Sequence, residues 1–240
     1  MVVGLAVGLS ALRSVLYFLL AVLAPGGLAA QQTTLNRSLA PQHPWIDLGL
    51  QLVFIAGLLA PVGVVLLLVA RDGESSTSIG LRLDRLAGDV GIGLGVAALV
   101  GGVGLLAYLV SHLLGLSLTV VPSSLPAQWW RLPVLVMSSL ANALLEEIVL
   151  AGYLVRRLEQ LRWPAARAVA LSAALRGLYH LYQGVAGALG NFVMGGLFAG
   201  YFARRRTVVP QIVAHASIDI VAFVGYQLLA GHVSWLPSPV

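Results

Sequence analysis

"ANALLEEIVLAGYLVRRLEQ", residues 141–160, places two adjacent carboxylates, Glu146 and Glu147, inside a run that is otherwise almost wholly apolar. Such a run predicts a membrane-embedded helix, in which a carboxylate near the centre costs about 2.5–3.5 kcal/mol on insertion scales. Two neighbouring carboxylates therefore require partners or a chemical task. Other segments of the chain have to supply one or the other.

The overall composition indicates a membrane protein. Hydrophobic residues occupy 59% of 240 positions, charged residues 10%, and the mean hydropathy is +0.92. These values predict an all-α fold, a polytopic transmembrane helical bundle of about seven spans, because a span needs roughly 20 apolar residues. We expect a single multi-pass membrane domain, 1–240, in which residues 130–225 carry the functional motifs. The expected spans are Ser10–Ala30, Trp45–Ala70, Val90–Leu114, Leu132–Val155, Pro164–Tyr182, Val185–Ala203 and Val208–Leu229.

The basic residues are all arginines, and their distribution predicts the topology. They gather in the connections after the second, fourth and sixth expected spans, whereas the connections after the first, third and fifth carry only Arg37 and Arg131. Because positively charged loops stay in the cytoplasm, we expect a cytoplasmic N-terminus and a C-terminus outside the cell membrane. The bilayer thus accounts for the net charge of +5, and no nucleic-acid partner is expected. The absence of Cys excludes disulfides and thiol chemistry.

Glycine and tryptophan add two structural expectations. Glycines cluster in the third and sixth expected spans, which predicts close helix packing there. Tryptophans fall near the expected span ends and are typical of interfacial anchors. The tryptophans are Trp45, Trp129, Trp130, Trp163 and Trp235.

Six ionisable side chains lie within the expected spans, on only three of them. Glu147 lies nine residues before Arg156, which follows the fourth expected span, and His215 lies nine residues after Arg206, which precedes the seventh. Nine residues correspond to roughly 13 Å of helix. Residues four apart share a helix face, so His215 and Asp219 share one and Arg176 and His180 share another. We therefore expect one cluster, formed by Glu146, Glu147, Arg176, His180, His215 and Asp219.

Three motifs carry these residues in order: "EEIVLAG", "RGLYH" and "HASID". In this combination residues 130–225 resemble the CPBP family of intramembrane proteases, related to the type II CAAX prenyl endopeptidases and including bacterial bacteriocin-processing and self-immunity membrane proteins. The family pattern is EExxxR, FxxxH and HxxxN or HxxxD, each on a different transmembrane helix. Ala151 stands where the family has Arg, and Arg176 stands where it has Phe.

The resemblance implies a glutamate-type endopeptidase that hydrolyses peptide bonds of membrane-associated peptides or proteins. Glu146 and His180 would activate water, with Glu147 in the same catalytic group. His215 and Asp219 would hold the oxyanion, although Asp219 is better suited to orient His215, as a supporting carboxylate does. No cofactor is expected on this resemblance.

Three alternatives stay open. Zinc could be bound by Glu146, His180 and His215, with Glu147 or Asp219 as base or supporting group, although no HExxH helix is present. A proton-coupled transporter also places Glu and His inside membranes, but it would often show an inverted repeat, and none is visible. A non-catalytic membrane protein of the same fold could use the two glutamates and Arg176 as a structural ion cluster.

Arg176 has an expected partner. Suppose that the fourth and fifth spans form an antiparallel hairpin that turns near Trp163. Residues whose numbers sum to 327 would then lie at the same depth on the two helices, so that Ala151 faces Arg176. The guanidinium would then reach Glu147 from the neighbouring helix and take the place of the missing family arginine. Ala151 would be small because the guanidinium needs the room.

Overall fold

The computed structural model describes residues 3–114, 118–229 and 232–233, and within these ranges it is a multi-pass bundle of apolar helices. Five helical units of the described chain are long and apolar enough to cross a membrane. The units are α2 (Pro44–Arg71), α3 (Leu86–Leu113), α4–η4–α5 (Arg131–Leu145, Glu146–Leu154 and Val155–Gln160), η5–α7 (Leu181–Gln183 and Gly184–Arg205) and α8 (Val209–Leu229). The predicted polytopic helical fold is confirmed, whereas the count of about seven spans is not.

Two of the expected spans are shorter helices. α1 (Leu9–Leu23), which follows η1 (Gly4–Gly8), and α6 (Ala165–Tyr179) have 15 residues each. That length corresponds to about 22 Å, less than the hydrocarbon core of a bilayer. α1 ends where Pro25 follows, because the residue before a proline is driven out of the helical region. α6 begins directly after Pro164, and its last turn ends at His180.

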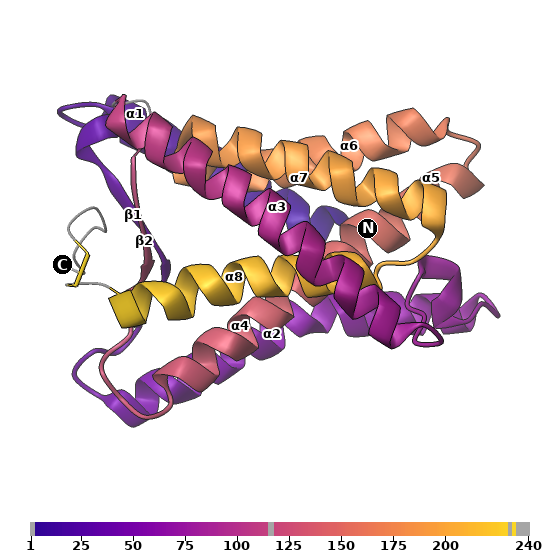
Figure 1. Cartoon of the computed structure of the whole chain (residues 1–240), viewed down its shortest axis with the longest axis horizontal. Coiled ribbons are helices and arrows are strands. Elements are labelled where there is room, and N and C mark those ends of the chain that lie inside the picture. Colours follow the sequence, from indigo (N-terminus) through magenta and orange to yellow (C-terminus); the bar gives the residue numbers. More distant parts are fainter. Residues whose placement is uncertain (1–2, 115–117, 230–231, 234–240) are drawn as a thin grey trace.

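The helices form two groups bridged by α3. Figure 1 shows α6 and α7 side by side along one edge, α8 with α4 and α2 along the other, and α3 crossing in front of both groups. Glycine permits the crossing, because a Cβ at Gly93 would lie 2.6 Å from the Cβ of Val213 on α8. Gly101 faces Ile218 of α8 in the same way, at 3.2 Å. A Cβ at any of the other glycines of the third expected span would meet nothing within 4 Å, so close packing explains only two of them.

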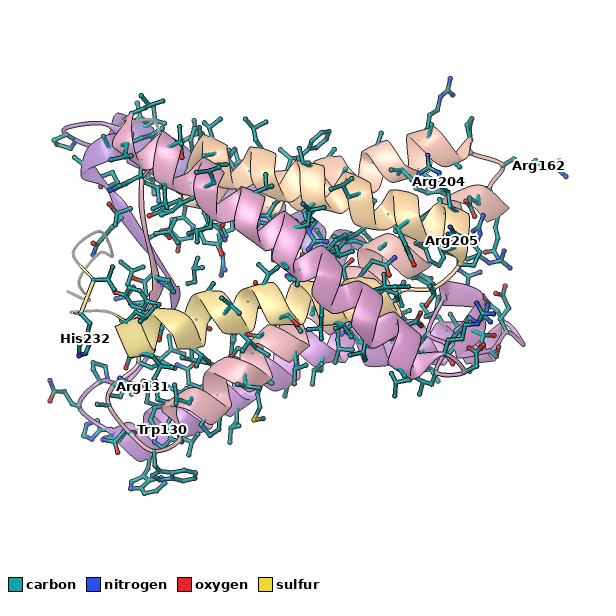
Figure 2. The ribbon with its side chains drawn as sticks, in the orientation of Figure 1. Trp130, Arg131, Arg162, Arg204, Arg205 and His232 are labelled. Carbon is teal, nitrogen blue, oxygen red and sulfur yellow. The ribbon has the colours of Figure 1, made fainter. Side chains whose placement is uncertain are left out.

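The arginine-rich connections gather at one end of the bundle. Figure 2 shows Arg162, Arg204 and Arg205 at one end of the long axis, and Arg131 and His232 at the other. Ion pairs join the connections at the arginine end: one links Arg157 of α5 to Asp72, and another links Arg206 to Glu159 at 2.5 Å. The alternation expected from the arginine pattern is thus present in the fold. Residues 234–240, in the expected outer tail, lie outside the described residues.

The opposite end carries a small element that the sequence did not indicate. Two strands, β1 (Gln32–Asn36) and β2 (Thr119–Ser123), form a parallel pair in which Gln32 lies opposite Thr119. The short helix η2 (Leu28–Ala30) precedes β1. The Gln227 amide of α8 donates to the Ser123 carbonyl at 3.2 Å and so holds the pair against the bundle. The all-α description therefore needs this addition.

The tryptophans near the ends behave in two ways. Trp45 and Trp129 are 70% and 73% exposed, as interfacial anchors would be, and Trp163 is 43% exposed. Trp130 is only 2% exposed and packs in an apolar cluster with residues of α2, α4 and α8, so its assignment as an anchor was wrong. Trp235 lies outside the described residues.

The helix that carries the paired glutamates changes type at that pair. α4 gives way at Glu146 to η4, a nine-residue π-helix that runs to Leu154. π-Helices are rare, occur mostly as short insertions in α-helices and are frequent at functional sites. Ile148 and Val149 of η4 pack in the apolar core with α2 and α7. Gly152 lets η3 (Ser76–Ile79) approach, since a Cβ there would lie 2.5 Å from the Ile79 carbonyl oxygen.

Candidate active site

The six expected site residues meet inside the bundle. Glu146 and Glu147 come from the first turn of η4, Arg176 from the last turn of α6, His180 from the residue that follows α6, and His215 and Asp219 from α8. Both glutamates, Arg176 and His215 are buried, with at most 6% of any of them exposed. The three motifs, well separated in the sequence, therefore contribute to one buried polar cluster.

Arg176 lies at the centre of this cluster. Its Nη1 atom is 2.6 Å from Glu147 Oε1, and its Nη2 atom is 2.9 Å from Glu146 Oε2. The same Nη2 atom lies 3.1 Å from Nδ1 of His215. A planar guanidinium suits such multiple contacts, because its donors are fixed in a fork. One cation thus contacts both carboxylates and one imidazole.

α7 makes the room that the Arg176 side chain occupies. A Cβ at Gly195 would lie 2.9 Å from Cδ of Arg176, so any larger residue there would displace the arginine. The guanidinium carbon lies 5.4 Å from the centre of the Phe198 ring, one turn further along α7. Gly195 and Phe198 therefore shape the space that holds the guanidinium.

The register between η4 and α6 differs from the expected one. The Ser172 hydroxyl donates to the Leu150 carbonyl at 3.0 Å, which places Ser172 beside Leu150. Arg176, one turn later on α6, then lies level with the two glutamates, and Ala151 lies near the level of Ser172. The expectation that Ala151 faces Arg176 was therefore wrong by about one turn. The guanidinium reaches Glu147 directly across the helix pair.

His180 faces Glu146 across a short gap. Its Nδ1 atom lies 3.0 Å from the Arg176 carbonyl oxygen, which can only accept a hydrogen bond, so Nδ1 carries the proton in that bond. In the neutral ring Nε2 is then an acceptor, and it lies 3.8 Å from Glu146 Oε1. Two acceptors face each other at a separation too long for a direct hydrogen bond.

His215 has both ring nitrogens directed at other members of the cluster. Nδ1 lies 3.0 Å from Glu147 Oε1 and close to Arg176, and Nε2 lies 3.6 Å from Asp219 Oδ2. Asp219 is one turn further along α8, with its side chain 19% exposed. This placement favours orientation of His215 by Asp219 more than donation by His215 to a substrate oxyanion.

Tyr179 belongs to the cluster, although the sequence analysis did not single it out. Its hydroxyl group lies beside Glu146, yet it is buried and makes no well-aligned hydrogen bond within the described chain. Its ring lies 4.3 Å from the ring of His180. The available signal was a polar aromatic residue directly before the histidine of the second motif.

The charges in the cluster do not balance. Three carboxyl groups, from Glu146, Glu147 and Asp219, face one guanidinium. Oε2 of Glu147 is buried and lacks an aligned hydrogen-bond partner among the described residues, whereas Oε2 of Glu146 has its ion-pair contact with Arg176. Buried carboxylate oxygens in that state favour a bound proton donor or cation.

The carboxylates and His215 also form a possible metal donor set. One donor atom from each of Glu146, Glu147 and His215 can be chosen so that all three lie within 4.8 Å of one another. The set expected from the sequence contained His180 in place of Glu147. In the structure His180 faces Oε1 of Glu146 at 3.8 Å and does not belong to that triplet.

An apolar cavity adjoins the cluster from the flank of the bundle. It has a volume of about 220 Å³ and lies between α3, α7 and α8. Phe198 lines it and also lies under the Arg176 guanidinium. Gln211, a second lining residue, is four residues before His215 and therefore on the same face of α8. The cavity thus ends at side chains that contact or neighbour the polar cluster.

Comparison with known proteins agrees with the motifs. Residues 128–221 match the family described as type II CAAX prenyl endopeptidase Rce1-like, and all six expected site residues fall within the match. Comparisons with curated proteins and with solved structures gave no match. The resemblance to the CPBP and CAAX protease family is thereby confirmed over residues 128–221, which form an Rce1-like segment of this chain.

Proposed function

We propose that the protein is an intramembrane endopeptidase that hydrolyses peptide bonds of membrane-associated peptides or proteins. Glu146 and His180 would hold and activate the water, without a cofactor. The observation that carries this proposal is the pair of facing acceptors, Glu146 Oε1 and His180 Nε2, 3.8 Å apart.

A shared water molecule is the simplest partner for these two acceptors. Water has two O–H donors, and an oxygen placed about 2.8 Å from each acceptor would satisfy both. Its lone pairs would then point away from the two side chains, toward a substrate. The Arg176 carbonyl fixes the tautomer of His180, and the Arg176 guanidinium fixes Glu146. The geometry is therefore set before a substrate arrives.

The proposed reaction needs no external oxidant or group carrier. The water oxygen attacks the scissile carbonyl carbon while a proton passes to the Glu146–His180 pair. The tetrahedral intermediate then loses its C–N bond, and the same proton goes to the leaving nitrogen, which gives a carboxylic acid and an amine. General acid–base catalysis of this kind contributes typically ~10²–10⁴-fold in rate.

A hydrogen-bond donor is needed for the oxyanion of that intermediate. His215 and Asp219 were expected in this role, but both nitrogens of His215 already contact other members of the cluster. The Tyr179 hydroxyl lies beside Glu146, and within the described chain it makes no well-aligned hydrogen bond. We assign the oxyanion to Tyr179 in this proposal, with His215, Asp219 and Glu147 holding the cluster in place.

The substrate would be an apolar, membrane-associated chain. The flank cavity is lined almost wholly by apolar side chains, and one of them, Phe198, lies 5.4 Å from the guanidinium carbon of Arg176. The arginine-rich end would face the cytoplasm, because arginine-bearing connections are retained there.

The test is cleavage of quenched fluorescent peptides that carry an apolar anchor, by the purified full chain in detergent. We expect Glu146→Gln and His180→Ala each to slow cleavage at least about 100-fold while the purified protein stays folded. Glu159→Gln and His112→Ala, which remove the same groups far from the cluster, are matched controls with near-normal rates. Near-normal turnover of either site variant would contradict the assignment.

A further inference from the structure

The contacts around Arg176 resemble those around a bound metal ion. Its two terminal nitrogens lie 2.6 Å from Glu147 Oε1, 2.9 Å from Glu146 Oε2 and 3.1 Å from His215 Nδ1. All three neighbours carry lone pairs that can point at the same cation, and each comes from a buried side chain. The guanidinium thus lies where the donors converge.

The same three side chains form a donor set that divalent metals accept. Zinc is bound by carboxylate oxygens and imidazole nitrogens at about 2.0–2.2 Å, which requires donors about 3.4 Å apart in a tetrahedron. His215 Nδ1 lies 3.0 Å from Glu147 Oε1 and 3.9 Å from Glu146 Oε2. Both separations lie within about 0.5 Å of the tetrahedral value.

The surroundings of His215 also fit a metal ligand. Metal-binding histidines generally direct their second nitrogen at a carboxylate or carbonyl oxygen. Nε2 of His215 lies 3.6 Å from Asp219, so Nδ1 is the nitrogen that faces the cation. Glu147 keeps a second oxygen, Oε2, that is buried without an aligned hydrogen-bond partner among the described residues, and this oxygen could complete the coordination.

Arg176 and a divalent ion cannot share this position. The Arg176 side chain passes Gly195, where a Cβ would lie 2.9 Å from Cδ, and its guanidinium occupies the space between the three donor atoms. Like charges also repel strongly in a buried, low-dielectric environment. The arginine therefore excludes the metal both by volume and by charge.

We propose that Arg176 is the resident cation of this site and keeps it free of divalent metal, and that its neutral replacement creates a zinc or cobalt site formed by Glu146, Glu147 and His215. The proposal goes beyond the hydrolytic function, because cation binding is measured without a substrate. It accounts for a metal-like donor set in a site for which we propose metal-free catalysis.

The experiment uses the purified full chain in detergent and titration with Co²⁺, read by visible absorption, with Zn²⁺ competition. Five proteins are compared: the unchanged chain, Arg176→Met, Arg176→Lys, His215→Ala, and Arg176→Met combined with His215→Ala. We expect Arg176→Met to bind one equivalent of Co²⁺ at least 100-fold more tightly than the unchanged chain. Arg176→Lys keeps the positive charge and the double variant loses a ligand, so neither should show the absorption band.

Loss of folding would not obscure the answer. Arg176→Met should gain thermal stability with Zn²⁺, and Zn²⁺ present during purification should raise its folded yield, because the metal replaces the lost ion pairs. The proposal is wrong if Arg176→Met fails to fold even with metal, or folds and binds no better than the unchanged chain. It is equally wrong if the unchanged chain binds one tight equivalent of Co²⁺ that His215→Ala abolishes. Peptide cleavage with a chelator, run in parallel, tests the hydrolytic function separately.

Discussion

Arg176→Phe, which introduces the family's usual residue, is the most informative change for stability. It removes the cation that contacts Glu147 at 2.6 Å, Glu146 at 2.9 Å and His215 at 3.1 Å. Each of these groups is at most 6% exposed, so water cannot replace the arginine. Removing one partner of a buried ion pair costs about 3–5 kcal/mol, since the charge left behind is uncompensated. In a chain of this size that cost corresponds to a Tm lowered by roughly 6–20 °C.

The assay is thermal unfolding in detergent at neutral pH, with Arg204→Phe as the matched control. Arg204 is exposed, and its side chain donates to the Gly200 carbonyl of its own helix at 3.5 Å. Its loss should change stability by no more than about 0.5 kcal/mol. Equal Tm values for the two variants would refute the view that Arg176 compensates the buried carboxylates.

The remaining predictions concern the missing family arginine, the oxyanion donor, the cavity and the topology. Ala151→Arg alone should destabilise the protein, because residue 151 is only 3% exposed. In the Arg176→Phe background the same change should restore part of the lost thermal stability. Additive Tm changes in a double-mutant cycle would show that an arginine at 151 does not replace Arg176. Tyr179→Phe should slow peptide cleavage by about 10²–10³-fold without lowering Tm, as loss of an oxyanion donor does, and an unchanged rate would remove Tyr179 from the site. Val96→Trp, which fills the cavity, should slow cleavage more than Leu106→Trp on the exposed side of α3; equal rates would place substrate access elsewhere. Cysteines introduced at Thr77 and Gln42, in connections at opposite ends, should react with membrane-impermeant reagents from opposite sides of intact cells, with Thr77 inside.

Much of the site could be predicted from the sequence, because burying its ionisable side chains in a membrane costs free energy and requires partners. Glu146, Arg176 and His215 stand out as ionisable residues in apolar runs, and their depths along the helices predict the cluster that the structure contains. Tyr179 did not stand out, since an aromatic residue with one polar atom is compatible with ordinary packing. The chemical roles of all these residues stay predictions.

Other features depend on tertiary contacts that no local pattern encodes. The π-helix η4 begins at Glu146, and the approach of η3 at Gly152 and the Ser172–Leu150 hydrogen bond accompany it. That change of helix type and those contacts set the register of η4 against α6, which differs by about one turn from the register expected for a simple hairpin. The strands β1 and β2 are five residues each and pair across more than 80 positions, so periodicity could not reveal them. The lengths of α1 and α6 depend on Pro25 and Pro164, whose effects on helix ends were underestimated.

Cleavage kinetics of Glu146→Gln, His180→Ala and the double variant test most directly whether the two residues activate one shared water. Side chains that hold the same water act as a unit, so the double variant should be no slower than the slower single variant. Losses that multiply in the double variant would mean that Glu146 and His180 act on separate steps. That result would contradict the central claim that the two acceptors, 3.8 Å apart, share a catalytic water.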